Sequence, residues 1–273
     1  MLLHLSDDFN LEKIKDSGQC FRWEKTDDHT YRIVHENSCL YISDLGNDQY
    51  DLDCTETEFY SVWENYFDLH ENYQNIRKKI NPETDPFLWT ASESQKGIRI
   101  LRQNPWEMLI TFIISQNRNI PAIQKSVKLL SETYGTPAQD SRGLKYFIFP
   151  SPEAIALSDE ESLNQCRLGY RAKYVRSAAE AVYSQKIDLD SLYQKKEQEV
   201  IKELTKLYGI GPKVANCISL FGLHHTDAFP KDVWINRILE KKYPDGYPFS
   251  QYSPYNGIFQ QYLFAYYRSH PDA

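Results

Sequence analysis

The chain has only five cysteines, and no two of them form a CxxC pair. Protein sites for zinc or iron–sulfur clusters need closely spaced ligands, so the sequence indicates neither. No apolar run approaches the roughly 18 residues of a membrane-spanning helix. The first residues lack the small-residue cleavage site of a signal peptide. We therefore expect a protein of the cell interior with no metal site and no membrane contact.

An excess of basic residues is also missing, because the net charge is −7 and the pI is about 5.6. Most nucleic-acid-binding domains are basic, so the composition disfavours a nucleic-acid partner. Net charge governs non-specific attraction, however, and does not decide what one groove binds. Acidic residues crowd into 44–71, whereas Lys and Arg are more frequent at 118–128, 167–176 and 206–242. A local basic surface thus remains open.

The first 80 residues combine short β-type segments with turns. Aromatic and β-branched residues dominate FRWEK, TYRIVHE and SCLYISD, and polar clusters separate these segments, a pattern typical of an antiparallel sheet. The apolar spacing of ETEFYSVWENYFD predicts a helix after them. The turn-forming sequence NPETDP at 81–86 indicates a boundary. We predict a sheet domain at residues 1–85.

Residues 86–273 are predicted to form a mostly α-helical domain. From about residue 98 the apolar spacing is helical in PWEMLITFIISQ, PAIQKSVKLLSETYG, RAKYVRSAAEAVYSQ and 199–208. Further helices are predicted to begin at Pro212 and Asp232, and the last to cover about 254–268. Together the two parts predict an α+β fold, with a small N-terminal antiparallel β-sheet domain followed by a mostly α-helical body.

Residues 199–222 predict two helices joined by a tight glycine turn. Gly209 and Gly211 permit positive φ and leave backbone N–H groups uncovered, and Pro212 suits the first position of the second helix. N–H groups at a helix N-terminus attract phosphate whatever the base sequence. Two such glycines alone are more typical of a plain packing corner. As an anion site, this turn would let an acidic chain bind DNA.

Lys213 is the second residue of the new helix, where the helix dipole disfavours the charged form of its amine. The dipole is insufficient alone, so desolvation in a pocket would have to supply the rest. A neutral lysine can attack a sugar C1′ and form a Schiff base. Asp232 is a good N-cap for the next helix, and its charge can stabilise a cationic sugar. A solvated lysine and a purely structural cap are the alternatives.

Further motifs lie along the chain before and after this hairpin. They are SGQCFRW (17–23), ISQNRNI (114–120), LGYRAKYV (168–175), FPKDV (229–233) and GIFQQYLF (257–264). In this order they resemble the 8-oxoguanine DNA glycosylase/AP lyase family of the helix-hairpin-helix superfamily, over nearly the whole chain. The resemblance implies a bifunctional enzyme of base-excision repair. Such an enzyme flips 8-oxoguanine, and optionally formamidopyrimidines, out of duplex DNA, excises it through a lysine Schiff base and cuts the strand by β-elimination.

The resemblance also implies a base pocket, with Lys213 and Asp232 as the catalytic pair beside it. Positions matching Cys217 and Phe264 sandwich the flipped base, and the one matching Gln260 bonds its pairing edge. The Gly18 carbonyl would accept the hydrogen that 8-oxoguanine carries at N7, where normal guanine has an acceptor. A buried polar group without a hydrogen-bond partner costs about 1–3 kcal/mol, so this contact can discriminate 8-oxoguanine from guanine. Core packing is the alternative for Cys217, Gln260 and Phe264 taken alone, and a simple turn glycine is the alternative for Gly18.

The DNA-binding residues that the resemblance implies lie elsewhere in the sequence. Asn117, Tyr170 and Arg171 match positions that contact the orphan cytosine or fill the gap in the base stack, and Gly209 and Gly211 belong to the phosphate-binding turn. A helix-end Asn and a surface YR pair are the alternative interpretations. The implied partner is double-stranded DNA containing 8-oxoguanine, and we expect a monomer.

Two departures from the eukaryotic pattern indicate a bacterial- or archaeal-type member. Ala122 replaces an arginine that contacts the orphan cytosine, and Trp234 replaces a histidine. No cofactor is required, although family hairpins can hold a monovalent cation. We expect a cytoplasmic location, at the nucleoid in a prokaryote. A glycosylase for another damaged purine and a non-catalytic helix-hairpin-helix DNA-binding protein are the alternative functions.

Overall fold

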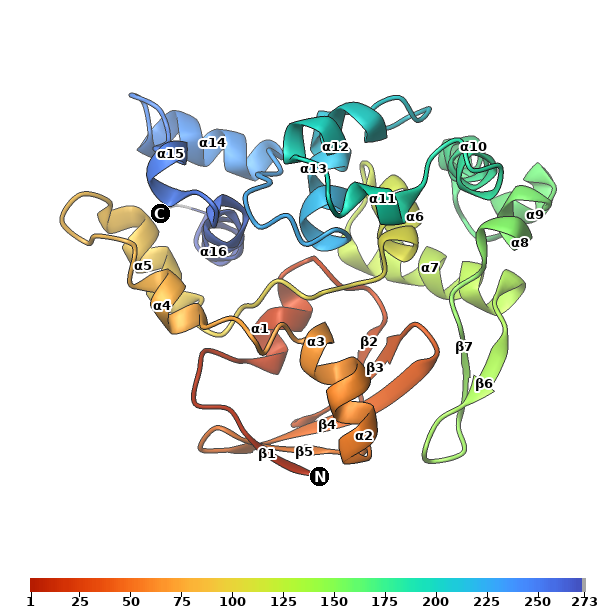
Figure 1. Cartoon of the computed structure of the whole chain (residues 1–273), viewed down its shortest axis with the longest axis horizontal. Helices are drawn as coiled ribbons and strands as arrows, with labels where there is room; N and C mark the ends of the chain where they lie inside the picture. The colour runs from red at the N-terminus through yellow and green to blue at the C-terminus, as the bar shows by residue number, and fades with distance from the viewer. Residues whose placement is uncertain (272–273) are drawn as a thin grey trace.

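The computed structural model describes residues 1–271 and consists of a five-stranded sheet followed by a larger helical body (Figure 1). The predicted α+β fold is therefore confirmed. The sheet lies at one end of the molecule, and the helices form a broad arc beyond it (Figure 1).

The sheet is antiparallel throughout, with strand order β1-β5-β4-β3-β2. The strands are β1 Leu2–His4, β2 Trp23–Lys25, β3 Thr30–His35, β4 Ser38–Gly46 and β5 Gln49–Leu52. Ile33 of β3 pairs with Leu40 of β4, and both are fully buried. The three predicted segments thus form the centre of the sheet and one edge, while β1 and β5 complete its other side.

Short helices cover the sheet and share its core. They are α1 Leu11–Asp16 and the continuous run of α2 Glu56–Glu58, the π-helical η1 Phe59–Trp63 and α3 Glu64–Tyr66. Leu11, Ile14 and Trp63 pack in one cluster with the apolar strand residues. The run over 56–66 matches the helix predicted for ETEFYSVWENYFD.

The helical body contains the remaining helices. They are α4 Tyr73–Arg77, α5 Pro86–Ser94, α6 Pro105–Ser115, α7 Ile120–Tyr134, α8 Pro152–Ala156, α9 Glu160–Gln165, the 3-10 turn η2 Gly169–Arg171, α10 Ala172–Tyr183, α11 Leu189–Leu192, α12 Glu197–Leu204, α13 Pro212–Phe221, α14 Val233–Lys242, α15 Phe249–Tyr252 and α16 Asn256–Ser269. Helix α6 is buried along its length and contacts α7, α10 and α13, while α16 packs against α5 and α14. The helices predicted from the apolar spacing are present.

Two features of the body differ from the sequence prediction. Helicity begins at α4 and α5 rather than near residue 98, because Asp85 caps α5 and Pro86 occupies its first position. A small hairpin of β6 Pro137–Gln139 and β7 Lys145–Phe147 also interrupts the helices. Asp140 in its loop accepts hydrogen bonds from Arg32 and Tyr41 of the large sheet, both at 2.9 Å, so the hairpin ties the two parts together.

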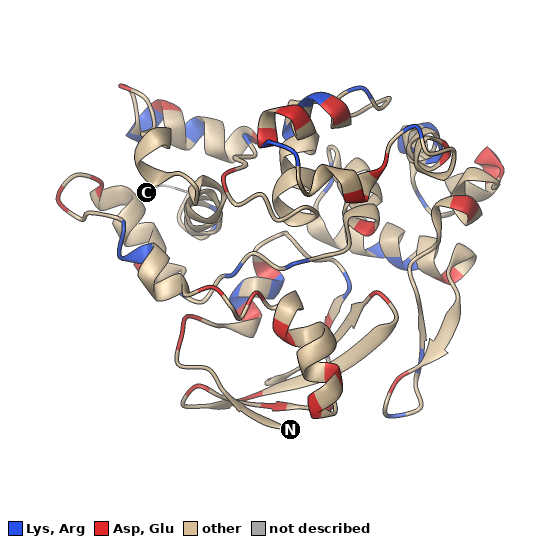
Figure 2. Ribbon diagram, in the orientation of Figure 1, with Lys and Arg blue, Asp and Glu red and all other residues tan. Residues whose placement is uncertain are grey.

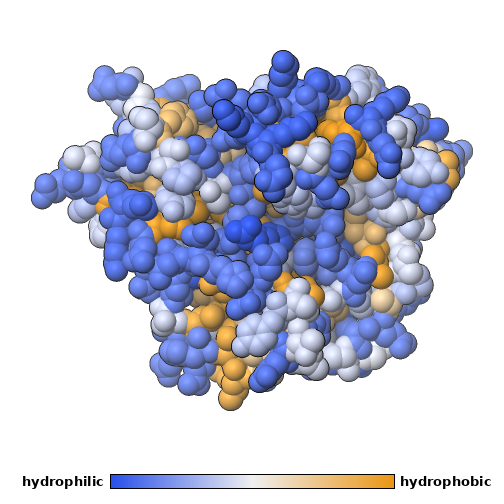
Figure 3. All heavy atoms as spheres, viewed as in Figure 1, coloured by the Kyte–Doolittle hydropathy of each residue, from blue (hydrophilic) through white to orange (hydrophobic). Residues whose placement is uncertain are grey.

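The surface charge is uneven, as the sequence indicated. Acidic residues mark α2 and α3 beside the sheet, whereas Lys and Arg occur along α7, α10 and α14 (Figure 2). The same face is largely hydrophilic, and its hydrophobic groups lie in separate small patches (Figure 3). Lys and Arg therefore mark several helices of the body, and α1 beside the sheet carries Lys13 and Lys15 as well (Figure 2).

Candidate active site

The predicted hairpin is present between α12 and α13. Gly209 has a φ of +83°, and a Cβ there would lie 2.4 Å from the Tyr174 ring, so the turn requires glycine. Gly211 is the N-cap of α13, and Pro212 is its first residue. No side chain of the described residues caps this helix, which leaves its first N–H groups open to an anion. The turn has the exposed helix N-terminus that a phosphate site requires.

Residues predicted from distant parts of the sequence line one cavity of about 60 Å³. The six are Gly18, Lys213, Cys217, Asp232, Gln260 and Phe264. They come from the segment after α1, from α13, from the start of α14 and from α16.

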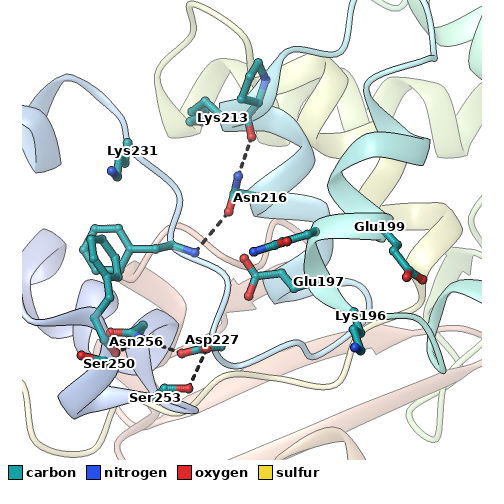
Figure 4. A pocket seen from close by; sticks show the side chains of 14 residues that line it. Lys196, Glu197, Glu199, Lys213, Asn216, Asp227, Lys231, Ser250, Ser253 and Asn256 are labelled. Carbon is teal, nitrogen blue, oxygen red and sulfur yellow. Dashed lines mark hydrogen bonds between the residues drawn. The ribbon is translucent and has the colours of Figure 1, made fainter.

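Lys213 and Cys217 lie one turn apart on α13, and both line the cavity. Burial raises the pKa of the Cys217 thiol, and the neighbouring Lys213 partly opposes that shift. The wall beside the lysine is therefore a neutral, polarizable thiol at neutral pH. Lys213 itself is half-buried and also borders an open groove of about 1110 Å³ on its other side (Figure 4). Lys213 thus lines both the candidate base cavity and a groove that opens to solvent.

Asn216 fixes the chain that leads to Asp232 against the helix that carries Lys213. Its Nδ2 donates to the Pro212 carbonyl at 2.9 Å, and its Oδ1 accepts from the Phe229 N–H at 3.2 Å (Figure 4). Asn216 was not predicted as a site residue, because an asparagine inside a helix carries no sequence signal for such a bridge.

Asp232 is the N-cap of α14, as the sequence predicted. Its Oδ1 accepts a hydrogen bond from the Ile235 N–H at 2.8 Å, and the residue is half-buried at the edge of the cavity. The cap uses one carboxylate oxygen and leaves the other available. The structural role of Asp232 is therefore compatible with an electrostatic role toward a substrate.

Gly18 forms the wall of the cavity opposite α13. Its φ is +81°, and a Cβ there would lie 3.6 Å from Cε1 of Phe264, so the Phe264 ring lies against this backbone. The next residue, Gln19, is fully buried, donates to the Arg99 carbonyl and accepts from the Leu101 N–H, both at 2.8 Å. These bonds hold the Gly18 segment in place.

Other residues of the cavity were not predicted from the sequence. They are Ser17, Phe112, Phe221, Pro230 and Gln261. Phe112 and Phe221 stack at 5.3 Å between ring centroids and form an apolar wall. Gln260 is buried, and its Nε2 donates to the Pro230 carbonyl at 3.2 Å. The only available signal for these residues was their position beside predicted ones.

The residues predicted for the orphan base form a separate cluster outside the cavity. Asn117 has a φ of +52°, and its Nδ2 donates to the Tyr170 hydroxyl at 3.3 Å. Tyr170 is half exposed, and the Arg171 guanidinium lies 4.3 Å from its ring centroid. Arg171 is buried and donates to the Gln116 and Leu168 carbonyls, which was not expected of a surface YR pair. Since guanidinium has five N–H groups, some donors remain for a base.

Gln116 connects this cluster to the hairpin. Its carbonyl accepts from Arg171 at 2.8 Å, and its Nε2 donates to the Gly209 carbonyl at 3.1 Å. Near the same turn, the Lys173 amine lies 5.7 Å from the Tyr208 ring centroid. The two sets of predicted DNA-contacting residues are thus joined through one glutamine, and a cation lies near the turn.

The two departures have ordinary packing positions. Ala122 is half-buried in the first turn of α7, and its N–H donates to the Asn119 cap. Trp234 packs near Tyr267 at 5.9 Å between centroids, with the Arg237 guanidinium 5.2 Å from its ring. In residues 1–271, no three His, Cys, Asp or Glu side chains are grouped to hold a metal ion, and no helix could cross a bilayer.

Two family models match consecutive parts of the chain. The model "8-oxoguanine DNA glycosylase, N-terminal domain" matches residues 1–109, and "HhH-GPD superfamily base excision DNA repair protein" matches residues 110–245. Among curated proteins, the N-glycosylase/DNA lyase of Saccharomyces cerevisiae is 31% identical over 265 residues. That alignment covers 85% of this chain and 68% of the yeast protein.

Solved structures agree with these matches over almost the whole chain. The 8-oxoguanine glycosylase/lyase of Clostridium acetobutylicum, in complex with double-stranded DNA containing cytosine opposite 8-oxoG, superposes with a TM-score of 0.90 and 32% identity, covering 99% of this chain and 98% of that one. MBOgg1 in complex with a low affinity DNA ligand gives a TM-score of 0.92 and 37% identity, with 99% and 96% covered.

Proposed function

Because the chain belongs to the 8-oxoguanine DNA glycosylase family of the helix-hairpin-helix superfamily, we propose that it excises 8-oxoguanine from duplex DNA in base-excision repair. It would act as a bifunctional DNA glycosylase and AP lyase. The observation that carries this proposal is the meeting of Lys213, Asp232 and the four base-pocket residues in one cavity. The formamidopyrimidines are proposed as further substrates.

In the proposed reaction, the Lys213 amine attacks C1′ of the flipped nucleotide. The C1′–N9 bond breaks, its electron pair leaves with the base, and the amine loses a proton to the departing base or to water. Asp232 stabilises the positive charge that develops on the sugar. The sugar ring then opens to a Schiff base, and loss of a C2′ proton expels the 3′ phosphate.

The remaining assignments concern DNA. We propose that Asn117, Tyr170 and Arg171 occupy the gap left by the flipped base, and that the turn at Gly209 and Gly211 binds a backbone phosphate. The exposed Tyr170 ring and the N–H groups that Arg171 leaves unused suit the first task, and open helix N–H groups suit the second. The presence of Ala122 argues for weak preference among opposite bases, which 8-oxoguanine opposite each of the four bases would measure.

The proposed function also has consequences for cofactor, assembly and location. We propose that no cofactor is required, and that the hairpin can hold a monovalent cation. The Gly209 and Leu207 carbonyls each accept one hydrogen bond and keep a second lone pair for such an ion. One chain supplies every residue of the cavity, which supports a monomer. The protein would act where genomic DNA lies, in the cytoplasm at the nucleoid of a prokaryote.

Borohydride trapping tests the central step. Reduction should link the wild-type protein covalently to a duplex containing 8-oxoguanine, whereas Lys213→Gln should give no adduct. Lys206→Gln is the matched control, because Lys206 lies in the same hairpin but is exposed and paired with Glu203. The control should trap like the wild type.

Three results would contradict the proposal in different ways. An adduct that survives Lys213→Gln would refute the lysine mechanism. Release of alkylated purines without any adduct would indicate a glycosylase for another damaged base. Duplex binding without release of any base would indicate a non-catalytic helix-hairpin-helix protein.

A further inference from the structure

Gln261 lies next to Gln260 on α16 and lines the same cavity. The residue is 3% exposed, and its Nε2 donates to Oε1 of Gln260 at 3.0 Å. Its own Oε1 is buried and has no hydrogen-bond partner among residues 1–271. A buried acceptor without a partner is rare in proteins, and in a ligand cavity it points to a donor on the ligand.

A proline fixes the orientation of both amides. Pro230 has no N–H, and its carbonyl can only accept, so Gln260 must present Nε2 to it. Oε1 of Gln260 therefore faces Gln261. Gln261 must donate from Nε2 to this oxygen, because the opposite orientation of its amide would place two acceptor oxygens against each other. This chain of bonds leaves Oε1 of Gln261 as a fixed acceptor.

The cavity thus offers two acceptors. Oε1 of Gln260 has a second lone pair beyond the one that Gln261 uses, and Oε1 of Gln261 is unused. Gln261 and Phe264 are three residues apart on α16 and so share one face of that helix. The acceptor therefore lies on the side of α16 that carries the ring proposed to stack on the base.

We propose that Gln261 is a specificity-determining residue, whose Oε1 acts with that of Gln260 to select a base presenting two donors on its pairing edge. A guanine-type edge presents N1–H and a 2-amino group. An adenine-type edge presents an acceptor at N1 and is rejected. The inference rests on the proposed function, which supplies the flipped base. It adds Gln261 as the residue that accepts a hydrogen bond from the second donor of that base.

Two substrates that differ by one donor test this inference. A duplex with 8-oxoguanine is compared with one containing 8-oxohypoxanthine, which lacks the 2-amino group. Wild-type protein should release 8-oxoguanine about 5- to 150-fold faster in single-turnover assays, because the analogue leaves one buried acceptor unpaired. Gln261→Met, which keeps the length of the side chain, should reduce this ratio at least about fivefold.

The controls separate specificity from general damage. The ratio of the two rates is measured on one preparation, so a loss of folded protein cancels, and Gln261→Ala should narrow the ratio in the same way. Strand cleavage at an abasic site needs Lys213 but no base, so it is measured for every variant to show whether the lysine still acts. Gln251→Met makes the same chemical change at an exposed position of α15 and should keep the wild-type ratio.

The outcomes are distinct. A wild-type ratio near one, or an unchanged ratio in Gln261→Met, overturns the role of Gln261 while 8-oxoguanine release continues. Failure of the wild-type protein to release 8-oxoguanine at all overturns the proposed function, and this inference with it. A ratio that narrows in both Gln261 variants and not in Gln251→Met supports the inference.

Discussion

Replacing Asp232 with asparagine separates its structural role from its proposed catalytic one. Oδ1 of Asp232 accepts from the Ile235 N–H at 2.8 Å, and the amide oxygen of asparagine can accept the same bond. Asparagine and aspartate are equally good N-caps. The substitution therefore keeps the cap and removes the negative charge next to Lys213.

The two effects have different sizes. Losing the charge at the start of α14 weakens the interaction with the helix dipole by about 0.3–1 kcal/mol. A loss of 1 kcal/mol lowers Tm by about 2–4 °C in a protein of this size class. Removing one preorganised electrostatic group from an active site slows the reaction by about 100- to 1000-fold. Asp232→Asn should therefore be nearly as stable as the wild type and far slower.

Single-turnover release of 8-oxoguanine and thermal unfolding measure the two effects side by side. Asp232→Ala is the comparison, because it loses the cap as well, at a further cost of about 1 kcal/mol. Both variants should be slow, and only the alanine variant should be clearly less stable. If Asp232→Asn retains the wild-type rate within about threefold, Asp232 is only a helix cap and the proposed mechanism is wrong.

Two other perturbations follow from the structure. Gly18→Ala costs about 1–2 kcal/mol through its φ of +81° and adds a methyl group beside Phe264, so 8-oxoguanine release should fall more than cleavage at abasic sites. Gly46→Ala, with a φ of +78° and open space around it, should lose stability only, and an equal fall in release would contradict this assignment. Burial lowers the pKa of His35 to about 4, so the unfolded chain binds a proton that the folded one refuses. The free energy of unfolding, measured by urea titration, should therefore fall by up to about 3 kcal/mol between pH 6.5 and 4. His35→Gln should make it less dependent on pH in this range, and an unchanged pH dependence would show that His35 is not its cause.

The elements that the sequence predicted are those with a local pattern. The composition of TYRIVHE predicts a strand and the apolar spacing of PWEMLITFIISQ predicts a helix, and these segments form β3 and α6. Strands β1 and β5 have only three and four residues, too few to show a pattern in composition, and β1 pairs with β5 at the far end of the sheet domain in sequence. The start of α5 had a local signal, since Asp85-Pro86 is a good helix start, but the surrounding turn residues outweighed it.

The site was predictable in pairs but not as a whole. Lys213 and Cys217, like Gln260 and Phe264, are four residues apart, which places each pair on one helix face. Spacing says nothing about how α13, α14 and α16 meet, and the family resemblance supplied that step. The proposed role of Gln261 could not be predicted from spacing. Its amide is oriented by Gln260, and Gln260 is oriented in turn by the Pro230 carbonyl, which is distant from both in sequence.

Residues 17–23 cross from one hydrophobic core to the other, since Phe21 packs in the helical core and Trp23 in the sheet core. The wall that Gly18 contributes therefore belongs to a segment that contacts both cores, whereas the helix that carries Lys213 packs in the helical core. A looser contact between the two cores would be expected to displace the Gly18 wall more than the nucleophile. The set of damaged bases that such a protein accepts would then depend on how tightly the two cores pack against each other. That set could change during evolution while the lysine chemistry stayed the same.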